Sequence, residues 1–491
     1  ITPTPETILN FKDFVDFKYD ETRNKYTIDP GEHWFFRERP DRPLLPPQFR
    51  FNWSSPFIIS SHDSKKVLFG SNHLFQSNDR GDNWKIISPD LSTNDKNLRN
   101  TSNGGGLTNS NTGGENHYTI ITISDTPVDT SIIWVGTDDG NVQITKNGGI
   151  SWENVRQNFS NVPKKSWVSR VEASKHKKGT AYVTFDNHRF DDNRPYVYVT
   201  SDYGKSWKNI TGNLPEKYSV YVIKEDYIDE NLLFVGTEES VYFSKEKGNS
   251  WEKLGKNLPT VAIHDLVIHP REGDIIAGTH GKSIWILDDI SPLRFLNKDK
   301  SNLFPTRIST KWIKINTGRK QPYFEFRGEN PPYGAIINFY SNSKINGELL
   351  ISKDEFESEK NTPSFRKSIE INKGINRFIW PFKLERTEQE LINYRDKFTG
   401  IKESLRNIVI DKKGLNSYNF KEQKSFNDLN KLRKKFLDNY GMYADGKKIF
   451  GDKLYNEFDV EEGIYNVMIR LDNGDKFTDR IIVREDPLKS N

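Results

Sequence analysis

Short runs of alternating apolar and polar residues, each followed by a polar turn, dominate the first 300 residues of this chain. Val142 and Ile144 precede one such turn, and Val197 and Val199 precede another, each pair spaced by one residue. This spacing places the apolar side chains on one face of a strand. Two such runs joined by a tight polar turn form a β-hairpin signature. The pattern therefore predicts antiparallel strands connected by hairpins.

The turn follows an eight-residue pattern of a hydroxyl residue, any residue, Asp or Asn, any residue, Gly, any two residues and Trp. The Asp or Asn side chain is expected to accept hydrogen bonds from N–H groups two residues on, and the Gly to supply a positive φ. The Trp is expected to pack back under the turn. In the fourth copy, Glu246 replaces the Asp. The pattern residues are Ser77, Asp79, Gly81 and Trp84; Thr145, Asn147, Gly149 and Trp152; Thr200, Asp202, Gly204 and Trp207; and Ser244, Gly248 and Trp251.

The spacing of the copies indicates a repeated unit. The last two copies stand 44 residues apart, and a four-stranded propeller blade takes roughly 40–50 residues. A second string, an apolar residue followed by Gly and a hydroxyl residue, recurs at Gly70, Gly136, Gly236 and Gly278. The last of these marks a fifth unit without the turn pattern. Residues 51–295 are therefore predicted to form five β-propeller blades.

The eight-residue motif resembles the Asp-box, or BNR repeat, of sialidases and sortilin. Longer strings at 51–56, 134–140 and 278–282 resemble a family of large bacterial secreted proteins, described as sortilin-like or as BNR-repeat "glycosyl hydrolases". The resemblance is close over about residues 45–295 and implies a β-propeller. It also implies a secreted or cell-envelope location in a bacterium, in the periplasm or at the outer membrane. The hydrolase label in that family rests on the Asp-box, which is a turn and not a catalytic device.

The segments outside the blades differ in character. Residues 1–50 are rich in Pro and predict an extended arm. Residues 296–384 and 446–491 carry strand patterns, including an Asn-Gly hairpin signal, and predict an immunoglobulin-like β-sandwich. Residues 385–445 show helical spacing of apolar residues and predict an inserted helical hairpin. The predicted fold class is thus all-β: an incomplete Asp-box β-propeller followed by an interrupted sandwich.

Five blades are expected to need a partner. Propellers have about 4–8 blades, but five rarely close a ring alone, and the family that this chain resembles has more repeats upstream. The expected partner is therefore an upstream propeller segment of the same precursor or another envelope protein. The chain begins at Ile1 without a signal-peptide pattern, which favours a processed chain or a part of a longer one.

Composition excludes several classes of protein. The formal net charge is +4, which gives no support for a nucleic-acid binder. The absence of Cys excludes disulfides and separates this chain from sortilin, which has a cysteine-rich module after its propeller. No run of 18 apolar residues predicts a transmembrane helix. The Gly-rich stretch 104–106 does not open a helix after a strand, so we expect no phosphate loop and no cofactor.

Propeller geometry indicates where a ligand would bind. The loops between blades and the turns between the second and third strands share one face, opposite the Asp-box turns. Their aromatic, cationic and imidazole side chains predict a mouth for a sugar or a peptide. The candidates are His117, Trp167, Arg170, His188, Glu239, His264 and His280. No two of the histidines stand at ligand spacing, so no metal site is expected.

Carboxylates at the same mouth leave a catalytic alternative open. Asp138 or Asp139 could pair with an acid from another blade, namely Glu115, Asp186 or Glu238, at the roughly 5–9 Å separation of a glycosidase. The competing interpretation is that Asp138-Asp139-Gly140 is a turn. The sequence contains no Gly-x-Ser-x-Gly elbow, and the three convergent arginines of a sialidase are not evident. A binding or scaffold protein is the favoured prediction, and a glycoside hydrolase acting on a polysaccharide is the alternative.

Overall fold

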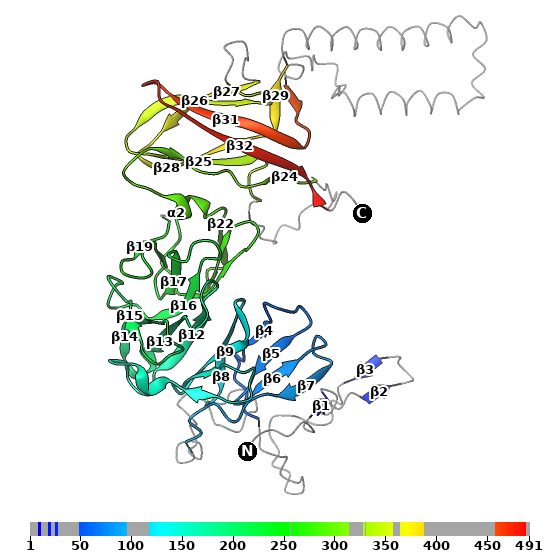
Figure 1. The fold of residues 1–491 in the computed structure, drawn as a ribbon, viewed down its shortest axis with the longest axis vertical. Coiled ribbons are helices and arrows are strands. Elements are labelled where there is room, and N and C mark those ends of the chain that lie inside the picture. The colour runs from blue at the N-terminus through cyan, green and yellow to red at the C-terminus, as the bar shows by residue number, and fades with distance from the viewer. Residues whose placement is uncertain are drawn as a thin grey trace, which may run out of the picture. The chain divides into compact units, whose positions relative to one another are not determined.

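The computed structural model describes residues 49–95, 117–255, 257–313, 328, 330–356, 364–386 and 457–487, and the backbone of three short strands near the N-terminus. Those strands are β1 (Ile8–Asn10), β2 (Lys18–Asp20) and β3 (Lys25–Thr27). The chain divides into two compact units, Ile1–Arg294 and Phe295–Asn491 (Figure 1). Most of the predicted N-terminal arm and nearly all of the predicted helical insertion lie outside the described residues. Within the described part, no helix is long and apolar enough to cross a membrane.

Unit 1 consists mainly of five antiparallel sheets, called sheets 1 to 5 in chain order. Each is a meander whose strands pair in sequence, and β1 adds an outer strand to sheet 1. Sheet 1 holds β4 (Phe57–Ile59), β5 (Val67–Gly70), β6 (Leu74–Ser77) and β7 (Asn83–Ile86), and sheet 2 holds β8 (Ile120–Thr126), β9 (Asp129–Thr137), β10 (Val142–Thr145) and β11 (Glu153–Asn154). Repetition of this four-stranded unit is typical of a β-propeller.

The remaining sheets of unit 1 continue the pattern. Sheet 5 has three strands where sheets 3 and 4 have four. Sheet 3 holds β12 (Trp167–Ala173), β13 (Ala181–Asn187), β14 (Asp192–Thr200) and β15 (Lys208–Asn209); sheet 4 holds β16 (Val220–Glu225), β17 (Leu233–Thr237), β18 (Val241–Ser244) and β19 (Glu252–Lys253); sheet 5 holds β20 (Ile263–Ile268), β21 (Ile275–Thr279) and β22 (Ile284–Leu287). Short helical turns lie at Arg156–Asn158, His188–Phe190 and α2 (Ser291–Phe295).

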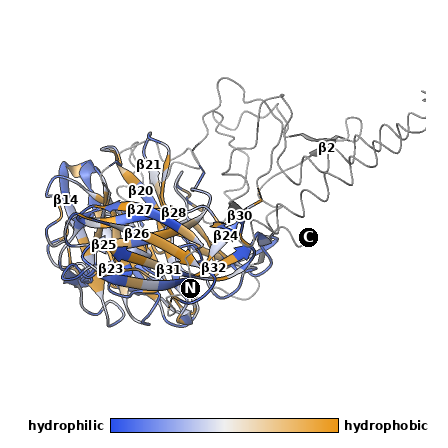
Figure 2. Ribbon diagram, turned by 90° about the horizontal axis from the view of Figure 1, so that it is seen from above, coloured by the Kyte–Doolittle hydropathy of each residue, from blue (hydrophilic) through white to orange (hydrophobic). Residues whose placement is uncertain are grey.

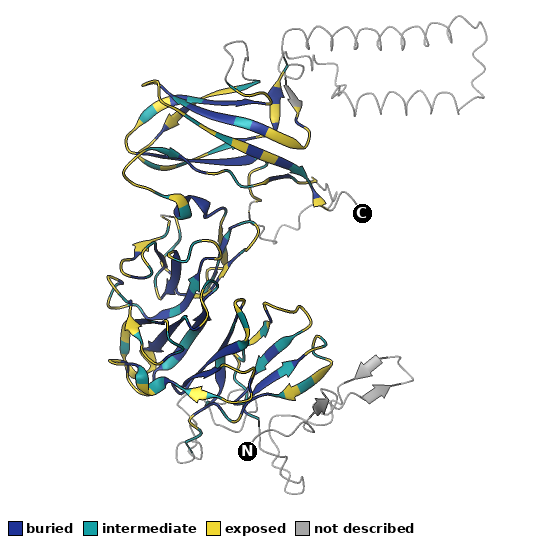
Figure 3. Cartoon of the chain, in the orientation of Figure 1, coloured by how far each residue is buried: buried dark blue, intermediate teal, exposed yellow. Residues whose placement is uncertain are grey.

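Neighbouring sheets pack face to face. Four hydrophobic clusters fill the four interfaces in turn, and strand interiors are accordingly buried (Figure 3). In the first interface, Leu68 and Leu74 of sheet 1 meet Ile120 and Ile133 of sheet 2. Because side chains alternate along each strand, one set faces the preceding sheet and the other faces the following sheet. The all-β propeller prediction is confirmed by this arrangement.

The Asp-box hairpins differ in one detail from the expectation. The Ser77 hydroxyl accepts the Gly81 N–H at 2.8 Å, and Asp79 Oδ1 accepts the Asn83 N–H at 2.9 Å. The Asp side chain therefore reaches four residues on rather than two, because the Ser77 hydroxyl already accepts the N–H of Gly81, two residues beyond Asp79. The second copy repeats the bond with Asn147.

The second and fourth hairpins also bond to the sheet before them. Trp152 Nε1–H donates to the carbonyl oxygen of Ile87, just after sheet 1, at 3.0 Å, and Trp251 donates to Ile210 at 3.0 Å. Gly149 has φ +98°, as expected for its place in the turn. A Cβ there would lie 2.5 Å from the Ile87 carbonyl oxygen. The turn glycine thus permits both the turn and close contact with the preceding sheet.

Unit 2 contains two larger sheets and a two-stranded ribbon. Phe339 and Trp380 from the three-stranded sheet share one core with Leu349, Val467 and Ile481 from the five-stranded sheet, and apolar residues concentrate on β25, β26 and β31 (Figure 2). The immunoglobulin-like topology stays a prediction. The strands are β23 (Asn302–Leu303), β25 (Ala335–Ser341) and β28 (Gly374–Trp380); β24 (Ser309–Lys311), β32 (Lys476–Glu485), β31 (Gly463–Leu471), β26 (Ile345–Ser352) and β27 (Phe365–Ile371); and β29 (Lys383–Glu385) with β30 (Glu457–Asp459).

Candidate functional site

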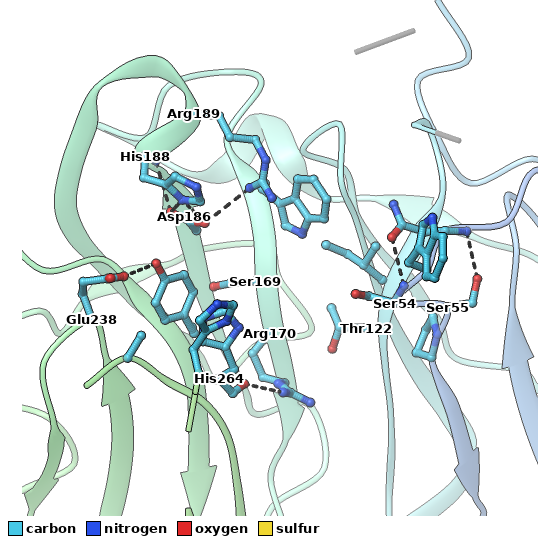
Figure 4. A pocket seen from close by; sticks show the side chains of 18 of the residues that line it. Ser54, Ser55, Thr122, Ser169, Arg170, Asp186, His188, Arg189, Glu238 and His264 are labelled. Carbon is cyan, nitrogen blue, oxygen red and sulfur yellow. Dashed lines mark hydrogen bonds and ion pairs between the residues drawn. The ribbon is translucent and has the colours of Figure 1, made fainter. Parts of the chain in front are cut away.

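A pocket of about 1280 Å³ lies in unit 1 and takes lining residues from all five sheets and their loops. Figure 4 shows Asp186, His188 and Arg189 grouped together, with Ser54 and Ser55 on the other side of the view. The loop before sheet 1 contributes Trp53, whose side chain is 81% exposed. A concave site that combines rings with a few polar groups is the usual form of a ligand-binding site.

The first strands of sheets 2 to 5 each carry a β-bulge at the same level. The pairing register shifts between Ile120 and Thr122, between Trp167 and Arg170, between Val220 and Val222, and between Ile263 and Asp265. A bulge inserts one extra residue and redirects its side chain. The unpaired residues inside these shifts that line the pocket are Ile121, Ser169, Tyr221 and His264. The repeated bulge therefore supplies one pocket residue from each of four sheets.

Three rings form a row on the side of sheets 4 and 5. The Tyr221 and His264 ring centroids lie 4.4 Å apart, and those of His264 and His280 lie 5.0 Å apart. The Tyr221 hydroxyl donates to Glu238. Burial and this carboxylate raise the pKa of Tyr221, so the phenol stays protonated. Burial and the neighbouring His280 lower the pKa of His264, which favours its neutral form.

A second group joins Trp167 to the turn that follows β13. The Arg189 guanidinium lies 3.8 Å from the Trp167 ring centroid. Asp186 is buried; its Oδ2 lies 2.6 Å from His188 Nδ1 and 3.5 Å from Arg189 Nη1. Burial lowers the pKa of Arg189, and Asp186 opposes that effect. The Asp186 carboxylate is thus held by His188 and Arg189, which belong to the turn that directly follows it.

Asp138 and Asp139 are buried and do not line the pocket. Asp138 accepts the Thr119 N–H at 2.8 Å and its hydroxyl at 2.7 Å, and Asp139 accepts the Thr93 N–H at 2.7 Å. Burial and the charge of Asp138 raise the pKa of Asp139. Asp138 contacts the pocket-lining residue His117, whose Nδ1 lies 3.4 Å from Asp138 Oδ2. Burial lowers the pKa of His117, but the hydrogen bond and charge of Asp138 outweigh burial and raise it.

The other predicted site residues fall into three groups. Glu115 lies outside the described residues. Glu239 lies away from the pocket lining and bonds to Tyr242 and Lys253, at 2.7 and 3.0 Å. The predicted residues that the structure brings together in the pocket lining are His117, Trp167, Arg170, Asp186, His188, Glu238, His264 and His280.

Sequence reasoning missed several lining residues, among them Trp53, Tyr221 and Lys282. Strand alternation does not reveal a bulge, so Tyr221 looks like an ordinary strand residue. Aligning the inner strands on the Gly of the next strand would have placed Tyr221 level with His264. Among the described residues there is no group of three or more side chains suited to hold a metal ion.

The repeated sheets and Asp-box hairpins define a β-propeller protein. A family model described as Sortilin-Vps10 (sortilin, neurotensin receptor 3) matches residues 195–392. This match confirms the resemblance to sortilin-like propellers that the sequence suggested. A comparison with curated proteins found no match.

Three solved structures are similar in part. The GH74 xyloglucanase from Xanthomonas campestris has 18% sequence identity and a TM-score of 0.35, over 46% of this chain and 35% of that one. The GH74 enzyme of Niastella koreensis has 11% identity and a TM-score of 0.28, over 57% and 50%. The β-propeller domain of Cps50 (Swd1) from Myceliophteria thermophila has 9% identity and a TM-score of 0.35, over 60% and 82%. This chain therefore spans half or less of the length of the two GH74 enzymes.

Proposed function

We propose that this protein is a secreted or cell-envelope propeller that binds a peptide, protein or glycan in the pocket of unit 1. The observation that carries the proposal is the state of the pocket acids. Asp186 is held by His188 and Arg189, and Glu238 accepts the Tyr221 hydroxyl. Both acids are thus engaged within the protein, which suits a preformed binding surface.

The rings of the pocket supply the binding energy in this proposal. Trp53, Trp167 and Tyr221 present aromatic surface together with an N–H or O–H group, a combination enriched where one face is apolar and the other wet. The bulges and the internal bonds of Asp186 and Glu238 hold the neighbouring side chains before a ligand arrives. Such preorganisation reduces the entropy lost on binding.

A glycoside hydrolase remains the second candidate for one specific reason. Asp186 and Glu238 line the same pocket and come from neighbouring sheets. An acid pair in one pocket is the minimum that glycoside hydrolysis requires. Asp138 and Asp139 fit that role less well, because their oxygens are buried in bonds to Thr119 and Thr93.

Binding is tested by retention of the purified protein on immobilised neutral polysaccharides, acidic polysaccharides and peptides. Trp53→Ala and Tyr221→Ala should weaken retention about tenfold, the usual scale for loss of a buried aromatic contact. Ile150→Ala is the matched control, because Ile150 is 76% exposed in an Asp-box turn and is not among the pocket residues. Retention that is unchanged in both pocket variants would contradict the proposed site.

Catalysis is tested separately by assaying new reducing ends with the soluble polysaccharides. Binding alone predicts no product from any of them. Product that forms with the wild type and disappears in Asp186→Asn or Glu238→Gln would establish the hydrolase instead. Asp138→Asn serves as the comparison, because it changes a buried acid outside the pocket lining.

A further inference from the structure

The described acids of the pocket in unit 1 are satisfied from within the protein. Asp186 Oδ2 lies 2.6 Å from His188 Nδ1 and 3.5 Å from Arg189 Nη1. Glu238 accepts the Tyr221 hydroxyl. Asp186 and Glu238 are the acids among the described residues that line the pocket. A ligand therefore meets no carboxylate without a partner on the described part of this wall.

The described cations of the pocket are less fully paired. Arg170 bonds to Asp265, with 2.8 Å between Nη2 and Oδ1. Arg189 contacts Asp186 at 3.5 Å, beyond the about 2.7–3.2 Å of an ordinary N–H···O bond. Lys282 is exposed, and no ion pair joins its ammonium group to another described residue. The charge left over in the described lining is thus positive, and a cleft of one sign attracts ligands of the opposite sign.

Arg189 keeps N–H groups that suit a carboxylate. Its guanidinium lies over the Trp167 ring, 3.8 Å from the ring centroid, and this contact covers one face of the group. The N–H bonds of a guanidinium point outward in its own plane, so the indole does not block them. Besides the long contact with Asp186, the Arg189 side chain makes no hydrogen bond to a described residue. The remaining N–H groups form a planar fork that matches the two oxygens of a carboxylate.

Ring surfaces are the second feature of the pocket. Trp53 is 81% exposed, and the rings of Tyr221, His264 and His280 form a row with centroids 4.4 and 5.0 Å apart. Such rings offer flat apolar surface with polar edges, which matches the C–H faces and hydroxyls of a sugar. The pocket volume of about 1280 Å³ exceeds the about 300–1,000 Å³ of sites for one small molecule. The pocket therefore suits several units of a polymer.

An extended peptide fits the described wall less well. The first strands of sheets 2 to 5 each pair on one side only, so their other edge is available. A peptide that adds to a sheet edge depends on a regular ladder of main-chain hydrogen bonds. The bulges at Ser169 and Tyr221 disturb the edge at the level of the pocket. A glycan needs no such ladder, because side chains supply its hydrogen bonds.

We propose that the ligand of this pocket is an acidic polysaccharide, with its uronate carboxylates at Arg189 and Lys282 and its sugar rings on the aromatic side chains. The inference rests on the ligand binding proposed above and names the chemical class of that ligand. It concerns binding alone and requires no bond of the polymer to be broken.

Matched polymers that differ only in charge test the role of the carboxylates. Polygalacturonate is compared with its methyl ester, and alginate with its propylene glycol ester, by equilibrium binding to the whole chain. Polyglutamate carries carboxylates on a peptide and is the third probe. At least one polyuronate should bind about fiftyfold more tightly than its ester, which is the product of about tenfold for a charged hydrogen bond and about fivefold for an exposed ion pair.

Two variants separate the two cations. Lys282→Gln should reduce the preference for the polyuronate over its ester about fivefold, and Arg189→Gln about tenfold. Lys282 is exposed, so its replacement should leave the melting temperature unchanged. Lys205→Gln is the matched control, because it removes the same charge from an exposed side chain in the third Asp-box turn, outside the pocket lining. The control should keep the full preference.

The outcomes distinguish this inference from the proposed site itself. Equal binding of the polyuronates and their esters, with both weakened in Trp53→Ala, would overturn the preference for acids and keep the pocket as a binding site. Tighter binding of polyglutamate would overturn it in favour of a peptide. Equal effects of Lys282→Gln and Lys205→Gln, or no binding of either polyuronate, would also overturn it. Binding of a polyuronate that is unchanged in Trp53→Ala and Tyr221→Ala would contradict the site.

Discussion

The Arg189 guanidinium lies over the indole of Trp167, with 3.8 Å between the guanidinium carbon and the ring centroid. This stacking holds two pocket side chains from different segments of sheet 3. We predict that Arg189→Lys lowers the free energy of unfolding by about 1 kcal/mol, because an ammonium cannot stack flat on the ring. Urea unfolding followed by Trp fluorescence measures the change.

The control for this substitution is Arg271→Lys. Arg271 is 59% exposed and pairs only with the adjacent Glu272 among the contacts described for it, so its replacement should leave stability unchanged. A loss of stability that is equal in both variants would mean that the Trp167 contact contributes nothing.

Two adjacent glycines in the second Asp-box allow the effect of backbone strain on stability to be measured separately from the effect of close packing. Gly148 and Gly149 have φ of +68° and +98°. A Cβ on Gly148 would meet nothing within 4 Å, whereas one on Gly149 would lie 2.5 Å from the Ile87 carbonyl oxygen. Gly148→Ala should lower the free energy of unfolding by about 1 kcal/mol, because Ala is strained in the left-handed conformation. Gly149→Ala should lower it clearly more, since the hairpin must also move away from sheet 1.

Thermal unfolding of the two Ala variants tests this difference. The larger drop in melting temperature should belong to Gly149→Ala. Equal drops would show that the contact with Ile87 adds nothing to the cost of positive φ.

The sequence predicted the repeated sheets well, because their signals are local. The turn pattern around Gly149 and the alternation of Val142 and Ile144 each lie within a few residues. These are the distances over which hydrogen bonds and strand faces are determined. One detail of the turn was predicted wrongly. The residue types identify Asp79 as the acid of the motif, but they do not show that the Ser77 hydroxyl accepts the Gly81 N–H and leaves Asp79 to accept the Asn83 N–H.

The pocket was less predictable because its residues meet through tertiary structure. Tyr221 reaches the pocket by a bulge, which leaves no mark in the apolar pattern of β16. Asp138 sits at the predicted mouth in sequence, yet its oxygens turn inward to Thr119. Loop position alone gives the level of a side chain in a propeller but not its direction.

A buried charge cluster between sheets 3 and 4 gives a third prediction. The two carboxylate oxygens of Glu172 lie 2.7 Å from Lys175 Nζ and 2.9 Å from Lys224 Nζ. Burial alone would raise the pKa of Glu172, but the two ammonium groups outweigh burial and lower it to about 2. Glu172→Gln should lower the free energy of unfolding by about 3–5 kcal/mol, because it leaves the ammonium groups of Lys175 and Lys224 near the core without the carboxylate that pairs with them.

The matched control is Glu153→Gln. Glu153 pairs with Lys146 at 3.0 Å, but both side chains are nearly half exposed, and such pairs contribute about 0–1 kcal/mol. Urea unfolding of both variants at neutral pH gives the comparison. A Glu172→Gln variant as stable as the control would show that the cluster is not coupled to folding.

The first Asp-box should make stability depend on pH in the acid range. Hydrogen bonds from Asn83 and Ser77 lower the pKa of Asp79 from 3.8 to about 2 in the folded protein. Because the folded pKa is depressed, this group stabilises the fold above about pH 4 and loses its contribution as the pH falls toward 2. Asp79→Asn should therefore fold normally at pH 7, as Asn147 does in the second copy, where its Oδ1 accepts the Ser151 N–H at 2.9 Å.

Melting temperatures between pH 7 and pH 2 test this prediction. The Asp79→Asn variant should lose less stability than the wild type from pH 4 to pH 2, because it has no proton to bind at this site. Part of the fall should persist, since the pKa of Asp202 is lowered to about 2 in the same way; the double variant with Asp202→Asn should reduce it further. Asp82→Asn removes an equal charge from the same turn and controls for net charge. An acid response that is identical in Asp79→Asn and the wild type would mean that the Asp79 hydrogen bonds do not stabilise the hairpin.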